Sequence, residues 1–368
     1  MRRSIIDKTL AYGIFLLFTT KVLLSSHTND YPKVDDLVKV CESIKKGPGL
    51  RRYCSNPERE IKYAIKGLHF AKNSCKQIFR NKRFDCDIDR MDIETRTNFL
   101  THSTKESIFF HAITSAGVAW ATARECANEF MKECTCSSNT LRNPNSTLAE
   151  CVDYIAFGLK QSRLFFNAFN LRPFLHSSVK VQKEAKNMVQ YGQKLGLRVF
   201  KKSLKKVCKC SGVSNSCVEK YCFYQFSSLR NIAEDIYKLY RRSYFNRYGA
   251  TYDVLSIRKW AMQQPIIFTD KSPSFCQRNS SAGTLGVAGR ECDTESVDKE
   301  NRCNELCCDN GFTTIQKSVE EKCKCEFILC CYTRCDKCNV SKSYNVCNDA
   351  NNFSMVNEGP NYIIEELV

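Results

Sequence analysis

The segment VCKCSGVSNSCVEK, from Val207 to Lys220, places three cysteines and three serines around one glycine. These residue types could form a serine nucleophile, a metal site, or a disulfide-stapled loop that presents a serine. A nucleophile elbow of the G-x-S-x-G type needs a second glycine, a following helix and a partner histidine. Here Ser216 and Cys217 follow Asn215, so the second glycine is missing. No histidine lies in a recognisable acid–base setting, and we predict that the chain is not an enzyme; the five histidines are His27, His69, His102, His111 and His176.

A zinc site is the second possibility, because Cys208-x-Cys210 and Cys335-x-x-Cys338 have spacings that zinc can use. Zinc ribbons of this kind belong in reducing compartments, and adjacent cysteines make awkward tetrahedral ligands. The third possibility, a stapled hairpin with Ser214 at its tip, fits better, since Gly212 can adopt the positive φ of a tight turn. If Cys210 pairs with Cys217 and Cys208 with Cys222, the hairpin must contain a bulge or an irregular turn.

The N-terminus predicts secretion. Residues 1–26 combine a basic start, a short apolar core from Leu10 to Phe18, and small residues at Ser25 and Ser26, which is typical of a cleaved signal peptide. An uncleaved anchor is the alternative. The 24 cysteines indicate a disulfide framework in an oxidising compartment. We therefore expect an extracellular glycoprotein, with sequons at Asn145, Asn279, Asn339 and Asn352.

The formal net charge of +17 implies an acidic partner. Outside the cell, sulfated glycans such as heparan sulfate fit this charge better than nucleic acid. The positive charge is gathered in runs, above all the run from Lys201 to Lys209. Solvated lysines that only aid solubility are the alternative. We expect the glycan to bind Lys201, Lys202, Lys205 and Lys206.

The elements that must position these residues differ between the two halves of the chain. Residues 41–222 hold twelve cysteines among helical patterns, and residues 276–347 hold the other twelve in a much shorter stretch. A cysteine-free stretch separates them. We expect an N-terminal helical domain over 27–245, a linker over 246–271 and a cysteine-rich C-terminal domain over 272–368.

Helical periodicity predicts four helices in the first half. One follows the N-cap candidate Asn56 and carries an apolar stripe to Ile78, and a second, over 108–130, has a stripe of small residues that should pack closely against a neighbour. The others are expected over Lys183–Lys206 and Ser227–Tyr244. The second half predicts only short strands, Lys324–Leu329 and Tyr332–Arg334, held by cross-links. The expected fold is a mainly α bundle with a stapled β-hairpin, plus a small disulfide-rich domain of short β-hairpins.

The segment CKCSGVSNSCVEKYCF resembles the signature of the Wnt family, usually C-K-C-H-G-V-S-G-S-C. Other motifs match this family in the same order; they are CKQIFRNKRFDC, KESIFFHAITSAGVAWATARECANEFMKECTC, YQFSSLRNIAEDIYKLY, SPSFC, GVAGREC, NELCCDNGFTT and CKCEFILCCYTRCDKC. The chain is identified as a divergent member of the family. It departs from the usual pattern at Ser211, Asn215, Tyr221, Phe84 and Leu329.

The resemblance implies a secreted ligand of Frizzled receptors that activates Wnt signalling in development and cell fate. In the family, the serine that corresponds to Ser214 carries a palmitoleoyl ester added by Porcupine, and the carrier Wntless escorts the acylated protein. A co-receptor of the LRP type or another kind also takes part. No cofactor is implied besides this covalent lipid. The receptor's cysteine-rich domain would contact a thumb at Gly212, Val213 and Ser214, and a finger at Phe327, Ile328, Leu329, Cys330, Cys331 and Tyr332.

The resemblance also implies the cystine pairs. In the first half these are Cys41–Cys54, Cys75–Cys86, Cys126–Cys134, Cys136–Cys151, Cys208–Cys222 and Cys210–Cys217. In the second half they are Cys276–Cys308, Cys292–Cys303, Cys307–Cys347, Cys323–Cys338, Cys325–Cys335 and the vicinal Cys330–Cys331. Three alternatives to an acylated ligand are a disulfide-rich lipid-handling enzyme, an unacylated variant of the family and an unacylated matrix glycoprotein.

Overall fold

The computed structural model describes residues 57–127, 134, 153–168, 179–211, 219–246, 265–328 and 332–349. The chain divides into two units. The first comprises Met1–Ile78, Cys86–Ser272 and Ser281–Gly283, and the second comprises Phe79–Asp85, Pro273–Ser280 and Thr284–Val368. The expected signal peptide and most of the expected linker lie outside the described residues.

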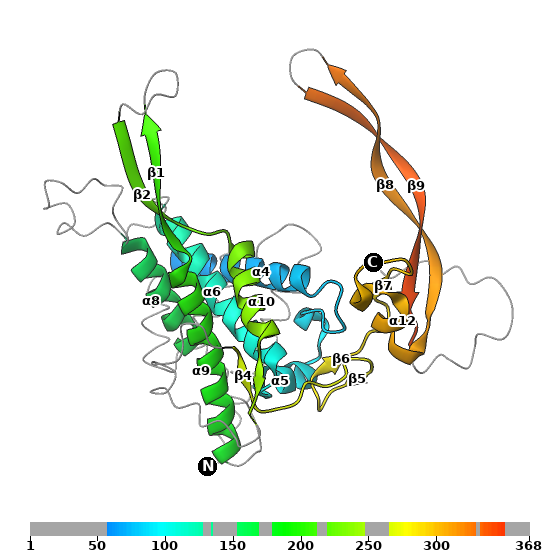
Figure 1. Ribbon diagram of the computed structural model, residues 1–368, viewed down its shortest axis with the longest axis horizontal. Coiled ribbons are helices and arrows are strands. Elements are labelled where there is room, and N and C mark those ends of the chain that lie inside the picture. Colours follow the sequence, from blue (N-terminus) through cyan, green and yellow to red (C-terminus); the bar gives the residue numbers. More distant parts are fainter. Residues whose placement is uncertain are drawn as a thin grey trace, which may run out of the picture. The chain divides into compact units, whose positions relative to one another are not determined.

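The first unit is a helical bundle around α6 (Lys105–Ala127), which packs against four other helices (Figure 1). These are α4 (Pro57–Ile78), α8 (Asp153–Ala168), α9 (Val179–Lys202) and α10 (Leu229–Arg241). A short α5 (Ile93–Thr101) begins at Asp92, whose carboxylate accepts a hydrogen bond from the N–H of Thr95 at 2.9 Å. Two-residue strands, β3 (Tyr244–Phe245) and β4 (Ile267–Phe268), pair in parallel beside the bundle.

Small residues let the helices approach α6 closely, as the sequence predicts. A Cβ atom on Gly67 of α4 would lie 2.5 Å from the carbonyl oxygen of Gly117, and one on Gly158 of α8 would lie 2.5 Å from that of Ala119. On α9, a Cβ on Gly196 would lie only 1.8 Å from the carbonyl oxygen of Ala112. The buried face of α6 is wider than a stripe, because its neighbours cover every residue except Lys105, Arg124 and Ala127.

The prediction of a helix over Lys183–Lys206 is wrong at its C-terminal end. Helix α9 ends at Lys202, and the N–H of the buried Ser203 donates to the carbonyl oxygens of Val199 and Phe200. The chain then enters strand β1 at Leu204. The sequence signal for this switch is the alternation Cys208-Lys209-Cys210, which has the period of a strand. The helix expected over Ser227–Tyr244 is α10, whose N-cap is Ser228.

The second unit contains a long antiparallel ribbon instead of the short strands predicted. Strand β8 (Phe312–Ile328) pairs with β9 (Tyr332–Cys347) along nearly its whole length (Figure 1). The register shifts between Cys323 and Glu326, where Lys324 has a φ of 46°. The prediction of two short strands assumed that dense cysteines exclude regular structure. They do not, because a cystine joins two neighbouring strands without breaking the ladder.

The base of the ribbon is held by a small core. Val287, Cys303, Leu306, Cys307 and Cys347 are buried together there. Three short strands and a one-turn helix surround it; they are β5 (Arg278–Asn279), β6 (Thr284–Leu285), β7 (Glu291–Cys292) and α12 (Cys303–Leu306). Strand β7 pairs with the end of β9. The base of the ribbon therefore packs against a core in which cystines supply much of the buried apolar surface.

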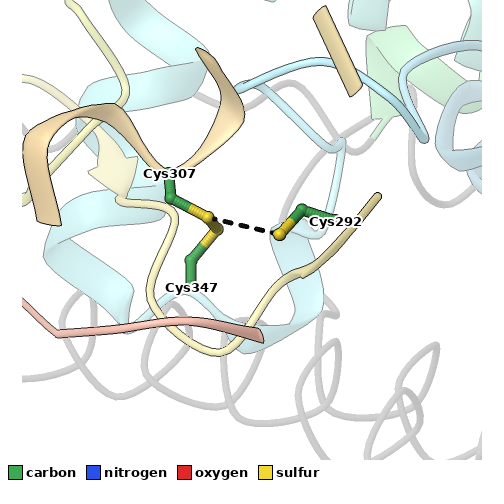
Figure 2. A group of neighbouring side chains, drawn as sticks. All are labelled: Cys292, Cys307 and Cys347. Carbon is green, nitrogen blue, oxygen red and sulfur yellow. Dashed lines mark hydrogen bonds between the residues drawn. A yellow bond between two sulfur atoms is a disulfide. The ribbon is translucent and has the colours of Figure 1, made fainter. Parts of the chain in front are cut away.

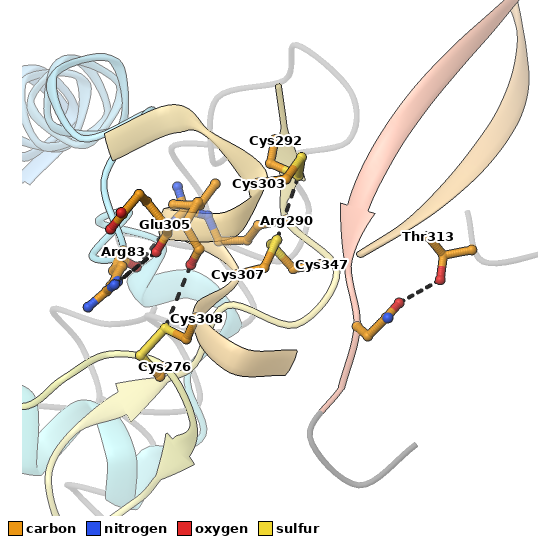
Figure 3. Close-up of a disulfide and its surroundings, with 12 residues drawn as sticks. Arg83, Cys276, Arg290, Cys292, Cys303, Glu305, Cys307, Cys308, Thr313 and Cys347 are labelled. Atoms are coloured by element: carbon orange, nitrogen blue, oxygen red, sulfur yellow. Dashed lines mark hydrogen bonds between the residues drawn. A yellow bond between two sulfur atoms is a disulfide. The ribbon is translucent and has the colours of Figure 1, made fainter. Parts of the chain in front are cut away.

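An arginine clamp organises the segment 79–85 in the same unit. The guanidinium of Arg290 is largely buried and donates to the carbonyl oxygens of Arg80 at 2.9 Å, of Arg83 at 2.7 Å, and of Lys82. Arg83 in turn donates to the carbonyl oxygen of Glu305 at 2.9 Å (Figure 3). Charged donors of this kind make stronger hydrogen bonds than neutral ones. The sequence motif GVAGREC thus supplies a residue that fixes a loop more than two hundred positions away.

Candidate functional site

The first part of the candidate site is the hairpin formed by β1 (Leu204–Ser211) and β2 (Glu219–Phe226). The strands pair in a regular register from Leu204 opposite Phe226 to Ser211 opposite Glu219, and Cys208 lies opposite Cys222. No bulge occurs in this ladder. Residues 212–218, which include Gly212, Val213 and Ser214, lie outside the described part of the chain.

The base of this hairpin is fixed to the helical bundle by aromatic side chains. The ring of Phe226 lies 5.6 Å from that of Phe200, 5.9 Å from that of Tyr154 and 6.3 Å from that of Trp120, measured between centroids. The hydroxyl of Tyr154 donates to the carbonyl oxygen of Tyr224 at 2.7 Å, and burial raises the pKa of this phenol. The indole N–H of Trp120 donates to the carbonyl oxygen of Ser227 at 3.1 Å.

These aromatic anchors are functional residues that the sequence reasoning missed. Trp120 lies on α6, Tyr154 on α8 and Phe200 on α9, so three helices hold one end of the hairpin. These contacts hold the end of β2 in a fixed position on the helical bundle. The available signal was the aromatic residue Phe226 at the end of the segment EKYCFYQF, but its partners could not be identified without the fold.

The four lysines expected to bind a glycan gather at the junction of α9 and β1. Lys201 and Lys202 form the last turn of the helix, Lys205 and Lys206 begin the strand, and all four are exposed. The ammonium group of Lys206 lies 5.9 Å from the ring centroid of Tyr224. These four exposed lysines, called the basic patch below, lie within six positions of the chain, where the helix ends and the strand begins.

The second part of the candidate site is the tip of the β8–β9 ribbon. Phe327 is 73 % exposed and Tyr332 is 60 % exposed, while Ile328 is half-buried. Leu329, Cys330 and Cys331 lie outside the described residues. Large apolar side chains normally cost free energy when they face water. At the observed exposure, Phe327 and Tyr332 do not fill the interior of the second unit.

The sulfur chemistry of the site is that of cystines. Seven of the pairs that the resemblance implies are present as bridges in the described residues; they are Cys75–Cys86, Cys126–Cys134, Cys276–Cys308, Cys292–Cys303, Cys307–Cys347, Cys323–Cys338 and Cys325–Cys335. Cys208 and Cys210 are also disulfide-bonded. The pairs Cys41–Cys54, Cys136–Cys151 and Cys330–Cys331 lie outside the described residues, as do Cys217 and the side chain of Cys222.

These bridges argue against the zinc possibility. The cysteines that have zinc-like spacing, Cys208, Cys210, Cys335 and Cys338, are all oxidised. Within the described ranges, one group of three sulfur atoms lies close enough to hold an ion, at Cys292, Cys307 and Cys347 (Figure 2). Each of these sulfurs belongs to a disulfide. A metal needs thiolates, so this cluster is not a metal site.

His69 and His111 lie on helices of the bundle. His111 is completely buried on α6, and desolvation lowers its pKa to about 4. One of its ring nitrogens lies 2.9 Å from the carbonyl oxygen of Leu100. Partial burial and the nearby ammonium group of Lys72 lower the pKa of His69, which contacts the side-chain amide of Asn73 at 3.0 Å. Both side chains serve the packing of the bundle.

Two of the four sequons fall in the described residues. Asn279 lies on β5 and Asn339 on β9, and both are exposed. Asn145 and Asn352 lie outside these residues. None of the helices in the described ranges is long and apolar enough to span a membrane.

Comparison with known proteins agrees with the motifs. A chain of the solved human WLS–WNT8A complex matches with a TM-score of 0.58 and 22 % identity, over 86 % of this chain and 99 % of that one. The N-terminal domain and linker of Drosophila WntD match with a TM-score of 0.41 and 18 % identity, over 59 % of this chain and 98 % of that one. Residues 45–348 match the sequence profile of the Wnt family. The chain therefore belongs to the Wnt family.

Proposed function

We propose that this Wnt-like signalling ligand binds the cysteine-rich domain of a Frizzled receptor through an acyl chain on Ser214 and through the tip of the β8–β9 ribbon. Members of the Wnt family are signalling ligands and not enzymes. The observation that carries the proposal is the anchored hairpin. Its strands run in register to Ser211 and Glu219, and Ser214 lies between these two residues in the sequence.

A hairpin of this kind suits recognition of one side chain by several proteins in turn. The aromatic anchors Phe226, Trp120 and Tyr154 fix its base, and the oxidised Cys208 and Cys210 restrict the strand that leads to Ser214. Strands that are already fixed in place lose little conformational entropy on binding. The same loop can thus serve an acyltransferase of the Porcupine type, a carrier of the Wntless type and the receptor.

The lipid would supply most of the binding free energy. About fourteen methylene groups at about 0.8 kcal/mol each give roughly 11 kcal/mol of gross burial before ordering costs. Such a chain needs an escort in water. The fold shared with a chain of the WLS–WNT8A complex supports a carrier of the WLS type for this protein as well. A co-receptor, of the LRP type or another, would then complete the signalling complex.

Mass spectrometry of the secreted protein tests the proposed modification directly. The peptide that contains Ser214 should carry the mass of a palmitoleoyl ester, and hydroxylamine, which cleaves esters, should remove it. The peptide that contains Ser227 and Ser228 offers an internal reference with two hydroxyls near the base of the hairpin. An unmodified Ser214 peptide in secreted, receptor-activating protein would overturn the proposal.

The ribbon tip gives a second prediction. Replacing Leu329 with Asp should weaken binding to a Frizzled cysteine-rich domain about tenfold, because a charge would then enter an apolar contact that Phe327 and Tyr332 flank. Leu329→Trp should strengthen binding, since the larger side chain buries more apolar area. Surface plasmon resonance with the purified receptor domain measures both effects.

Val297→Asp is the matched control for the ribbon tip. Val297 is 95 % exposed in the same unit but lies far from the tip in the sequence, so its change should leave receptor affinity intact. Correctly bridged Leu329→Asp protein that binds as tightly as the wild type would exclude this tip as a contact.

The basic patch gives a third prediction. Replacing Lys201, Lys202, Lys205 and Lys206 with Gln should lower the salt concentration that elutes the protein from heparin, because four cations of one patch would be lost. The matched control replaces four exposed lysines that are spread over α4, α8 and α9, namely Lys62, Lys160, Lys186 and Lys194. Both variants lose the same charge. Equal shifts in elution would show that net charge, and not this patch, determines heparin binding.

A further inference from the structure

Two disulfides touch in the core of the second unit. Cys292 is bonded to Cys303, and Cys307 is bonded to Cys347. The Sγ atom of Cys307 lies 3.6 Å from that of Cys292, which is van der Waals contact (Figure 2). The Sγ atoms of Cys292, Cys307 and Cys347 all lie within 4.8 Å of one another. Sulfur atoms at this distance are close enough for an exchange of bonding partners.

The contact follows from the geometry of α12. The N–H of Cys307 donates to the carbonyl oxygen of Cys303 at 2.9 Å, so the two cysteines stand one helical turn apart. Residues four apart on a helix share a face. Cys292 on β7 therefore meets two sulfur atoms on the same side of α12, and it is bonded to one of them while it touches the other (Figure 3).

We propose that Cys307 is a site of thiol–disulfide exchange, whose unpaired thiolate attacks the Sγ atom of Cys292. A Cys292–Cys307 bond forms, the Cys292–Cys303 bond breaks, and Cys303 leaves as a thiolate that takes up the proton lost by Cys307. One disulfide is exchanged for another, so the step needs neither an oxidant nor a reductant. Cys303 and Cys307 are both buried, which keeps the reacting sulfurs together.

The identity of the native bridges then depends on Cys347. It is the last cysteine of the chain and is 40 positions from Cys307, whereas Cys292 is only 15 positions from Cys307. Closing the shorter loop costs less entropy. While Cys347 is absent or reduced, the disulfide partner of Cys292 exchanges between Cys303 and Cys307. When Cys347 arrives as a thiolate, it attacks Cys307 in the Cys292–Cys307 form and releases Cys292.

Completion of the native pattern calls for a partner of a defined class. The thiols of Cys292 and Cys303 must then be oxidised, and a thiol–disulfide oxidoreductase that accepts two electrons and two protons supplies that step.

The opposite rearrangement has a structural consequence. Once Cys347 is reduced and Cys307 has moved to Cys292, the end of β9 has no covalent bond to the segment that follows α12. In that form, the backbone of Cys347 at the end of β9 still makes hydrogen bonds with the backbone of Gly289 and Arg290.

The test is the variant Cys347→Ser, which leaves Cys307 without its partner. Secreted protein is alkylated under acidic quench, digested without reduction and mapped by mass spectrometry. We expect a linked Cys292–Cys307 peptide with alkylated Cys303, beside a remaining fraction of the Cys292–Cys303 bridge with alkylated Cys307. Alkylated Cys307 with an intact Cys292–Cys303 bridge and no Cys292–Cys307 peptide would overturn the proposal. The control is Cys308→Ser, which frees Cys276, a residue outside the sulfur group described above; Cys276 should be alkylated and the other bridges unchanged.

Wild-type protein gives an independent measurement if Cys347→Ser is not secreted. A phosphine opens disulfides at acidic pH, where thiols stay protonated and exchange is slow. Reduction continues until Cys347 takes up label, and a second portion is brought to pH 8 before alkylation. We expect the label to move from Cys307 to Cys303 in that portion. Label that stays on Cys307 at pH 8 would contradict the exchange.

Discussion

Ser214→Ala should abolish receptor activation and lower receptor affinity by at least about a thousandfold, which corresponds to about 4 kcal/mol. The reason is that the substitution removes the only atom to which the proposed acyl chain is attached, whereas the hairpin keeps its strands and anchors. The gross burial of the chain is larger than this loss, but ordering costs offset part of it. Receptor binding and a signalling reporter measure the two effects. The secreted amount should also fall, because a carrier that binds the acyl chain would no longer bind this variant.

Ser216→Ala is the matched control for this prediction. Ser214 and Ser216 both lie among the seven residues between β1 and β2, and the two variants lose the same hydroxyl group. Ser216→Ala should be secreted and active at the wild-type level. Ser214→Ala protein that activates the receptor as strongly as the wild type would contradict an essential acyl chain. Equal losses from both variants would indicate damage to the hairpin.

The thumb hairpin was predictable from sequence because its signals are local. Two cysteines at strand spacing, a glycine and a second group of cysteines indicate a stapled turn without knowledge of the fold. Its attachment was not predictable in this way. Phe226 meets Trp120, Tyr154 and Phe200 from three helices, and contacts between residues so distant in sequence leave no short-range pattern.

The ribbon shows the opposite case, in which a local pattern was misread. Cysteines at positions 323 and 325 alternate as strand residues do, and cystines to Cys338 and Cys335 join β8 to β9; the Cys325–Cys335 bridge lies within the register shift. Polar residues on an isolated two-stranded ribbon do not need to alternate with apolar ones, because both faces can be exposed. The hydrophobic pattern that normally reveals a strand was therefore weak from Thr313 to Glu326.

The helical bundle was predicted best where small residues recur on α6. The sequence indicated close packing but not which helices would come close. A small residue permits a close approach, but it does not determine which helix makes it. The structure supplies the partners, which are Gly67 on α4, Gly158 on α8 and Gly196 on α9. The approach at Gly196 is the tightest of the three, because its added Cβ would lie 1.8 Å from a backbone oxygen, against 2.5 Å at the other two glycines.

Gly196→Val should therefore unfold the bundle or prevent secretion. The new Cβ would lie 1.8 Å from the carbonyl oxygen of Ala112 and 2.5 Å from the Oγ atom of Ser115, so α9 would have to move away from α6. The hydroxyl of Ser115 also bridges these helices by donating to the carbonyl oxygen of Gln193 at 2.9 Å, and that bond would be lost. Overpacking of a rigid backbone contact should cost more than about 3 kcal/mol, a large share of the stability of an ordinary domain.

The matched control places the same side chain on the exposed side of α9. Lys194→Val should change the free energy of unfolding by less than about 1 kcal/mol, because only helix propensity is altered there. The secreted yield and the urea midpoint of whatever protein is secreted measure both variants. Gly196→Val protein that is secreted normally and unfolds at the wild-type midpoint would mean that α9 can shift without cost. The hairpin would then lack a rigid base, because one residue separates the end of α9 from β1, and Phe226 on β2 packs against Phe200 on that helix.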